Sequence, residues 1–137
     1  MTNFERFAPA IATFYIGMAG VAVAFGSVVL RGGAPVTPEL YGPAVYAIPA
    51  LAWVAVQLLG SLMAAAGAIK GGYLGAWICV AGSAVSTVLH ATFAVLSQMA
   101  EHGTLLSAGS VFLTTPLSAA SGMIALRYAL RGIHGRQ

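Results

Sequence analysis

Residues 71–100 read GGYLGAWICVAGSAVSTVLHATFAVLSQMA and contain no charged side chain. A membrane-spanning helix needs about 20 mainly apolar residues, so this stretch is long enough for one crossing and too short for two. Three more intervals without a charge accompany it, of 24 residues between Arg6 and Arg31, 30 between Glu39 and Lys70, and 25 between Glu101 and Arg127. Each interval predicts one spanning helix, and we place the four spans at 8–30, 44–69, 73–100 and 104–129.

The composition is typical of an integral membrane protein. Of the 137 residues, 59% are hydrophobic and 7% are charged, whereas a soluble domain carries roughly 25% charged residues. Six basic and three acidic side chains cannot cover the surface of a soluble protein of this length. The basic residues are also scattered, while a nucleic-acid interface needs a clustered basic face. We therefore expect the lipid bilayer as a partner and no nucleic acid.

The connections between the spans predict an antiparallel arrangement. Gly71 and Gly72 form a turn between the second and third spans, and residues 101–103 form one between the third and fourth. Connections this short force neighbouring helices to run in opposite directions. The chain is thus expected to be one all-α domain, residues 1–137, an integral membrane four-helix up-down bundle. Residues 22–24 resemble a signal-peptide cleavage site, but the apolar run continues past them, so we expect an uncleaved helix.

The basic residues predict the orientation of the bundle. With four spans, one side of the membrane carries Arg6, Lys70, Arg127, Arg131 and Arg136, and the other side carries Arg31 alone. Basic residues concentrate on the cytoplasmic side of membrane proteins. Both termini should therefore be cytoplasmic (N-in, C-in), in a bacterial inner membrane or the inner membrane of a phage host.

Small residues recur on every predicted helix at spacings that allow close packing. The candidate packing faces are Gly17 and Gly20 on the first helix, Gly60, Ala64 and Ala68 on the second, Gly82 on the third and Gly122 on the fourth. Lipid supplies no hydrophobic force between helices, so close backbone approach and interhelical hydrogen bonds must hold the bundle together. These faces predict tight packing, either within one chain or between copies.

Two polar stripes follow the third and fourth spans. They consist of Ser83, Ser86, Thr87, His90 and Ser97 on the third, and Ser107, Ser110, Thr114, Ser118 and Ser121 on the fourth. In an antiparallel pair His90 should lie level with about Thr114, near a kink at Pro116. Gln57 adds a polar group halfway along the second span. The stripes are typical either of a hydrogen-bonded seam between the helices or of a water-lined path in an oligomer.

His90 is the only ionisable side chain near the middle of a predicted span. Three interpretations remain open for it. It is a neutral imidazole bonded to a serine or threonine across the helix pair, an axial ligand of haem or chlorophyll, or a titrating gate residue of a channel. In the second case Ser86, one turn earlier, would leave room for the macrocycle. We expect no metal and no cofactor, with haem or chlorophyll at His90 as the alternative.

The residues needed for catalysis do not gather at one depth. The sequence contains no aspartate, and its three carboxylates, Glu5, Glu39 and Glu101, all lie at span ends. Catalysis inside a membrane needs acids, bases, nucleophiles or metal ligands close together. We therefore expect no enzymatic activity and assign no catalytic residue.

These patterns favour a non-enzymatic membrane protein that works as a homo-oligomer, either pore-forming or structural. Short loops, four spans and a basic tail give it a layout that resembles phage holins and the virion proteins that phages eject into the host envelope. The resemblance is one of layout and rests on no motif. The alternative is an accessory or anchor subunit of a respiratory or photosynthetic complex, in which other membrane subunits cover the packing faces and His90 binds haem or a pigment.

Overall fold

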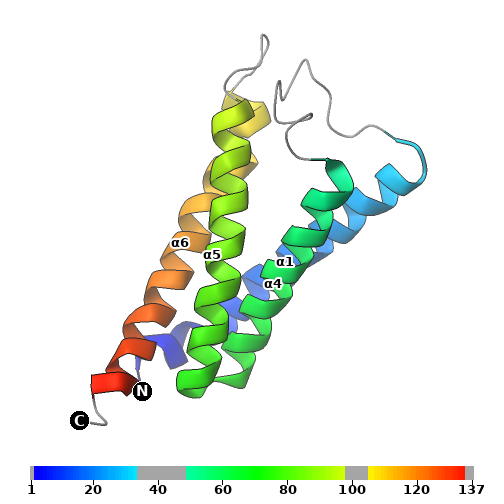
Figure 1. Ribbon diagram of the computed structural model, residues 1–137. Coiled ribbons are helices and arrows are strands. Elements are labelled where there is room, and N and C mark those ends of the chain that lie inside the picture. The colour runs from blue at the N-terminus through cyan, green and yellow to red at the C-terminus, as the bar shows by residue number, and fades with distance from the viewer. Residues whose placement is uncertain (1, 34–48, 98–104, 135–137) are drawn as a thin grey trace.

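A computed structural model describes residues 2–33, 49–97 and 105–134, with residues 97, 105–112 and 134 described by their backbone alone. These residues form four helices, α1 (Asn3–Leu30), α4 (Ala50–Lys70), α5 (Gly72–Ser97) and α6 (Leu105–His134). The chain is an all-α four-helix up-down bundle (Figure 1), as the sequence predicted.

The helices extend beyond the predicted spans at two ends. α1 begins at Asn3 because Thr2 caps it: the Glu5 amide donates to Thr2 Oγ1 at 3.3 Å, and the Thr2 amide donates to the Glu5 carboxylate at 2.9 Å. Such a reciprocal capping box satisfies two amides at the start of a helix. At the other end of the chain α6 continues to His134. The predicted second span begins too early, because Pro49 is in an extended conformation and α4 starts only at Ala50. The predicted helical residues 44–48, 98–100 and 104 lie outside the described part.

A two-glycine turn reverses the chain between α4 and α5. Gly71 and Gly72 have φ angles of 66° and 62°, a region that residues with a Cβ atom rarely adopt. The amide of Gly71 donates to the Gly67 carbonyl at 3.1 Å and ends α4. α4 and α5 are therefore antiparallel neighbours, as the short connection predicted.

Each helix packs mainly against the next one along the chain. α1 packs against α4, α4 against α5 and α5 against α6, while the contact between α1 and α6 is small. Figure 1 shows that this small contact lies at the end of the bundle that carries both termini, and that α1 and α4 diverge from α5 and α6 toward the opposite end. The bundle is closed at one end and splayed at the other.

Glycines bring the backbones of α4 and α5 into direct contact. A Cβ atom built on Gly82 would lie 2.5 Å from the Gly60 carbonyl oxygen, and one built on Gly67 would lie 2.5 Å from the Gly75 carbonyl oxygen. Helices approach this closely only where side chains are absent. Gly122 of α6 makes a looser contact, since a Cβ atom added there would lie 3.1 Å from the Cβ atom of a serine on α5.

Three helices are long and apolar enough to cross a membrane, judged over the described residues. They are Asn3–Leu30, Ala50–Lys70 and Gly72–Leu96. Large apolar side chains such as Ile16, Leu59 and Val88 point outward from them, as lipid-facing side chains do. α6 is not among the three over its described residues, which exclude the side chains of residues 105–112.

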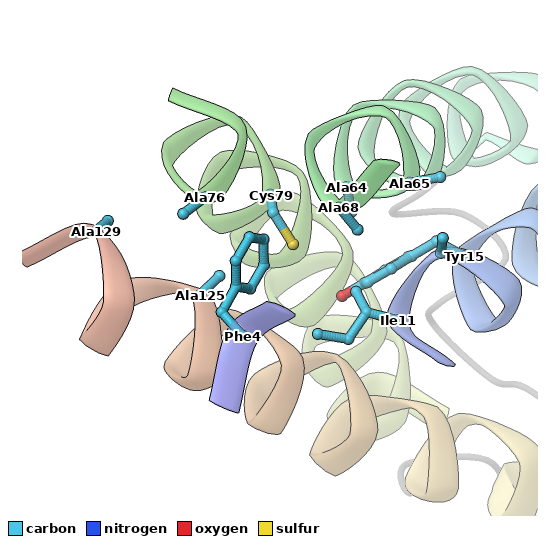
Figure 2. Close-up of a cluster of buried hydrophobic side chains, with 11 residues drawn as sticks. Phe4, Ile11, Tyr15, Ala64, Ala65, Ala68, Ala76, Cys79, Ala125 and Ala129 are labelled. Carbon is cyan, nitrogen blue, oxygen red and sulfur yellow. The ribbon is translucent and has the colours of Figure 1, made fainter. Parts of the chain in front are cut away.

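The hydrophobic core lies at the end of the bundle that carries the termini. Figure 2 shows Phe4, Ile11 and Tyr15 of α1 pointing into a space bordered by alanines of the other three helices. Phe4 also stacks on Tyr128 of α6, with ring centroids 5.3 Å apart, and Tyr128 stacks on Tyr73 of α5 at 4.9 Å. These rings join three helices at that end.

Candidate functional site

Buried polar side chains lie along the middle of the bundle. Within the described part of the chain they are Gln57, Ser61, Ser83, Ser86, His90, Ser118 and Ser121, which we call the polar seam. They come from α4, α5 and α6. α5 contributes to the seam on both sides, since it packs between α4 and α6.

Gln57 links α4 to α5 within the seam. Its side chain is fully buried, and its Nε2 donates to Ser61 Oγ at 2.7 Å and to Ser86 Oγ at 3.4 Å. Its Oε1 is also buried and has no hydrogen-bond partner among the described residues. A buried amide that satisfies only one of its two ends is unusual, because the unpaired end has lost its water without replacement.

His90 lies one helical turn after Ser86 on α5, and its side chain is 2% exposed. Its Nδ1 is 2.7 Å from the carbonyl oxygen of Ser86. A carbonyl oxygen can only accept, so Nδ1 carries the proton and donates. The edge of Trp53 on α4 packs against the imidazole at a centroid distance of 6.3 Å and an angle of 87°. Among the described residues Trp53 Nε1 is buried without a partner, as Gln57 Oε1 is.

The surroundings of His90 do not fit a haem or chlorophyll. An axial ligand must present a ring nitrogen to a metal at the face of a wide, flat macrocycle. Here the imidazole is enclosed and Trp53 packs on it. The space that Ser86 was expected to leave for a macrocycle is occupied by the Gln57 side chain, which hydrogen-bonds to that serine. Among the described residues no group of three or more His, Cys, Asp or Glu side chains could hold a metal ion.

Tyr15 brings α1 into the seam. Its side chain is fully buried, and its hydroxyl donates to the Ser118 carbonyl oxygen on α6 at 3.4 Å. The side chains of Ser83, Ser118 and Ser121 lie close to this hydroxyl. Ser118 Oγ itself makes no hydrogen bond of good geometry within the described part. Tyr15 therefore stands where three helices meet around serine side chains.

Other hydroxyl groups bond within their own helices. Thr87 Oγ1 donates to the Ser83 carbonyl at 2.7 Å, and Ser121 Oγ donates to the Leu117 carbonyl at 2.8 Å. Such bonds to the preceding turn are the usual state of serine and threonine in membrane helices. Ser118 Oγ does not follow this pattern within the described part of the chain.

The remaining predicted site residues are placed less fully. The side chains of Ser97, Ser107 and Ser110 lie outside the described part, and Thr114 is half-buried. α6 runs through Pro116 as one helix, and the kink stays a prediction.

The contacts of two glycines align α6 with α5. A Cβ atom on Gly122 would meet Ser83, and one on Gly132 would meet the Tyr73 ring. If this residue-to-residue alignment of α5 and α6 is continued along both helices, His90 lies opposite Thr115, one residue from the predicted Thr114.

No known protein family, curated protein or solved structure matches this chain. Its function must therefore be inferred from the seam itself. The seam contains hydroxyl, amide and imidazole groups, and the described residues place no carboxylate beside them. Such groups can bind water or a neutral hydrogen-bonding molecule and can pass a proton along hydrogen bonds. They offer no strong nucleophile with a base and orienting acid.

The sequence did not identify three residues of this site, namely Tyr15, Trp53 and Ser61. Tyr15 lies in the middle of the first predicted span, whereas aromatic side chains of membrane proteins favour the two membrane surfaces. Its depth is the signal that could have marked it. Ser61 follows Gln57 by four residues and therefore shares its helix face, which was a second available signal.

Proposed function

We propose that this chain is a non-enzymatic integral membrane protein with four spans and cytoplasmic termini, which acts as a homo-oligomeric pore-forming component. The observation that carries the proposal is the polar seam with two atoms unpaired among the described residues, Gln57 Oε1 and Ser118 Oγ. Leaving a buried polar group unpaired costs about 1–3 kcal/mol. Alanine or leucine would pack helices at these positions without that cost. Polar side chains kept there favour contact with water along the seam.

The geometry of the ends supports the proposed topology. Both termini and the α4–α5 turn lie at one end of the bundle in Figure 1. Arg31 caps the C-terminal end of α1, which lies at the other end. The first group includes the exposed side chains of Arg6, Lys70, Arg127 and Arg131. The positive-inside rule assigns that end to the cytoplasm. α6 has 30 residues, a length of about 45 Å, which exceeds the roughly 30 Å hydrocarbon layer and supports a fourth span.

The proposal of an oligomer rests on the outward face of α1. A Cβ atom added at Gly17 or Gly20 would meet no atom within 4 Å, so this predicted packing face makes no contact with the other described helices. A neighbouring copy could bring its backbone close there.

Ion flux into liposomes tests the pore. Purified protein should release a trapped ion or proton gradient faster than protein-free liposomes do. Gln57→Leu and Ser118→Ala remove hydrogen-bonding groups from the seam with little change in volume, and both should lower the flux. Thr13→Val is the matched control, because Thr13 is exposed and bonds only to the Pro9 carbonyl of its own helix, at 2.9 Å. Wild-type liposomes that are as tight as empty ones would overturn the pore.

The accessory-subunit alternative has a separate readout. Protein purified from its native membrane should be colourless if the pore proposal is right. A Soret band that disappears in His90→Ala would favour the alternative instead, since it would show that the packing of Trp53 and Gln57 around His90 opens to admit a macrocycle.

A further inference from the structure

Large and small side chains are unevenly divided in the hydrophobic core. Its large, fully enclosed side chains, Phe4, Ile11 and Tyr15, all belong to α1. The fully buried core residues of the other three helices are all small, and the partly buried Val80, Ile124 and Tyr128 pack around them; the small residues are Ala64, Ala65, Ala68, Ala76, Cys79, Ala125 and Ala129. We call the first group the plug and the second the socket. Figure 2 shows the plug side chains entering the socket from the α1 side, with the Phe4 ring beside Cys79.

The socket is continuous with the polar seam. Cys79 Sγ in the socket is 3.9 Å from Ser83 Oγ in the seam. The Tyr15 ring belongs to the plug, while its hydroxyl bonds to the Ser118 carbonyl oxygen of α6 at 3.4 Å. Tyr15 thus lies where the seam ends. Without the plug side chains, the space between α4, α5 and α6 would extend from the seam to the end of the bundle that carries the termini.

The contacts that hold α1 at that end are made by its side chains. α4 and α5, in contrast, are locked by backbone contacts at Gly60 and Gly82, which cannot slide without a clash. α1 packs along α4 and reaches α6 through a small contact that includes the Phe4–Tyr128 stack and the long hydrogen bond of Tyr15. Pro9, inside this part of α1, lacks the amide that would bond to the carbonyl one turn earlier. Residues 3–15 can therefore withdraw without breaking a backbone contact of the kind that joins α4 to α5.

We propose that residues 3–15 of α1 form a plug that closes the polar seam at the cytoplasmic end, and that withdrawal of Phe4, Ile11 and Tyr15 opens it. The inference rests on the proposed pore function and deepens it by naming the closing element. It also explains the composition of the socket. Three helices that met each other directly would bury larger side chains, whereas alanines leave the volume that α1 fills.

Cys79 is a built-in reporter for this plug, because it is the single cysteine of the chain and is fully buried in the socket. A small, charged methanethiosulfonate reagent reacts only with a thiol that water can reach. In liposomes the wild-type protein should label slowly. Phe4→Ala/Tyr15→Ala should label about tenfold faster or more, because both large plug side chains are removed, and its ion flux should rise as well.

Phe25→Ala is the matched control. Phe25 is another large aromatic residue of α1, but it packs on Trp53 with ring centroids 5.0 Å apart, in the half of the helix beyond the plug. Its loss should leave Cys79 labelling unchanged. Helical circular dichroism and gel-filtration elution must match the wild type for every variant. If the double variant fails this check, Phe4→Ala alone decides, since it alters one turn and keeps the Tyr15 hydrogen bond.

The outcomes separate the plug from the pore. Folded plug variants whose Cys79 stays as unreactive as in the wild type would overturn the plug. Faster labelling without any ion flux would support the plug and overturn the pore. Wild-type flux that plug removal leaves unchanged would support the pore and overturn the plug.

Discussion

Replacing Gly82 with alanine adds one methyl group at the closest approach of α4 and α5. Its carbon would lie 2.5 Å from the Gly60 carbonyl oxygen and closer still to the backbone nitrogen of Ala64, whereas non-bonded atoms prefer about 3.5–4.0 Å. Both neighbours are backbone atoms, so the helices must separate by roughly 1 Å along this contact. Overpacking typically costs about 1–3 kcal/mol, and a backbone clash belongs in the upper part of that range.

Alanine also favours the helix over glycine by about 0.5–1 kcal/mol. The net loss of unfolding free energy should therefore be about 1–2.5 kcal/mol, or roughly 5- to 65-fold in the unfolding equilibrium constant. Reversible unfolding in mixed micelles, titrated with sodium dodecyl sulfate and followed by helical circular dichroism, measures this change. The midpoint of Gly82→Ala should fall to a lower dodecyl sulfate fraction than that of the wild type.

Gly20→Ala is the matched control in micelles that hold single copies, because the same methyl group meets no atom of its own chain within 4 Å. It should stabilise the protein by up to about 1 kcal/mol through helix propensity alone. The two substitutions thus have opposite signs. If Gly82→Ala unfolds at the same dodecyl sulfate fraction as Gly20→Ala, the close contact between α4 and α5 does not exist and the packing argument is refuted.

Three further predictions use the same protein. Tyr15→Phe should lower the free energy of unfolding by less than about 1 kcal/mol, because the hydrogen bond of the hydroxyl is long. Tyr15→Ala should lower it by about 3–5 kcal/mol, because it empties the socket. Equal losses for the two variants in the micelle titration would contradict this. Gln57→Leu should leave stability within about 1 kcal/mol of the wild type, because it removes an unpaired oxygen together with one good hydrogen bond; a far larger loss in that titration would argue against it. In a Cys79→Ser background, Lys70→Cys should resist impermeant maleimide in intact cells, whereas a cysteine placed within residues 32–43 should react; the reverse pattern would place the termini outside.

Charge-free intervals located the helices because the length of a span is fixed by the bilayer and not by neighbouring helices. They located the helix ends less well. α1 starts at Asn3 because of the capping box between Thr2 and Glu5, a local signal that hydrophobicity does not carry. α6 continues through Arg127 and Arg131 to His134, since a helix can leave the membrane without ending. The capping box could have been recognised in the sequence.

Helical periodicity places a polar residue on a face but does not say which neighbour that face meets. Ser118 and Ser121 belong to a predicted stripe, and the structure buries both. Tyr15 is buried because α1 crosses α6 beside it, which depends on tertiary packing and leaves no periodic pattern. Gly17 and Gly20 show the opposite case. Their spacing suits packing, yet the buried face of α1 is the one with Ala12, Ala19, Ala22 and Gly26, and the two glycines point away from it.

The two-glycine turn between α4 and α5 has a consequence for biosynthesis. Contacts between segments close in sequence form early, so these two helices can pair as a hairpin as soon as both have left the ribosome. α1 is made first but cannot complete its contacts then, because Tyr128 and Ser118 belong to the last helix. Until α6 is in place, the Phe4 and Tyr15 side chains lack these partners. The first helix synthesised can thus complete its contacts only after the last one has been made.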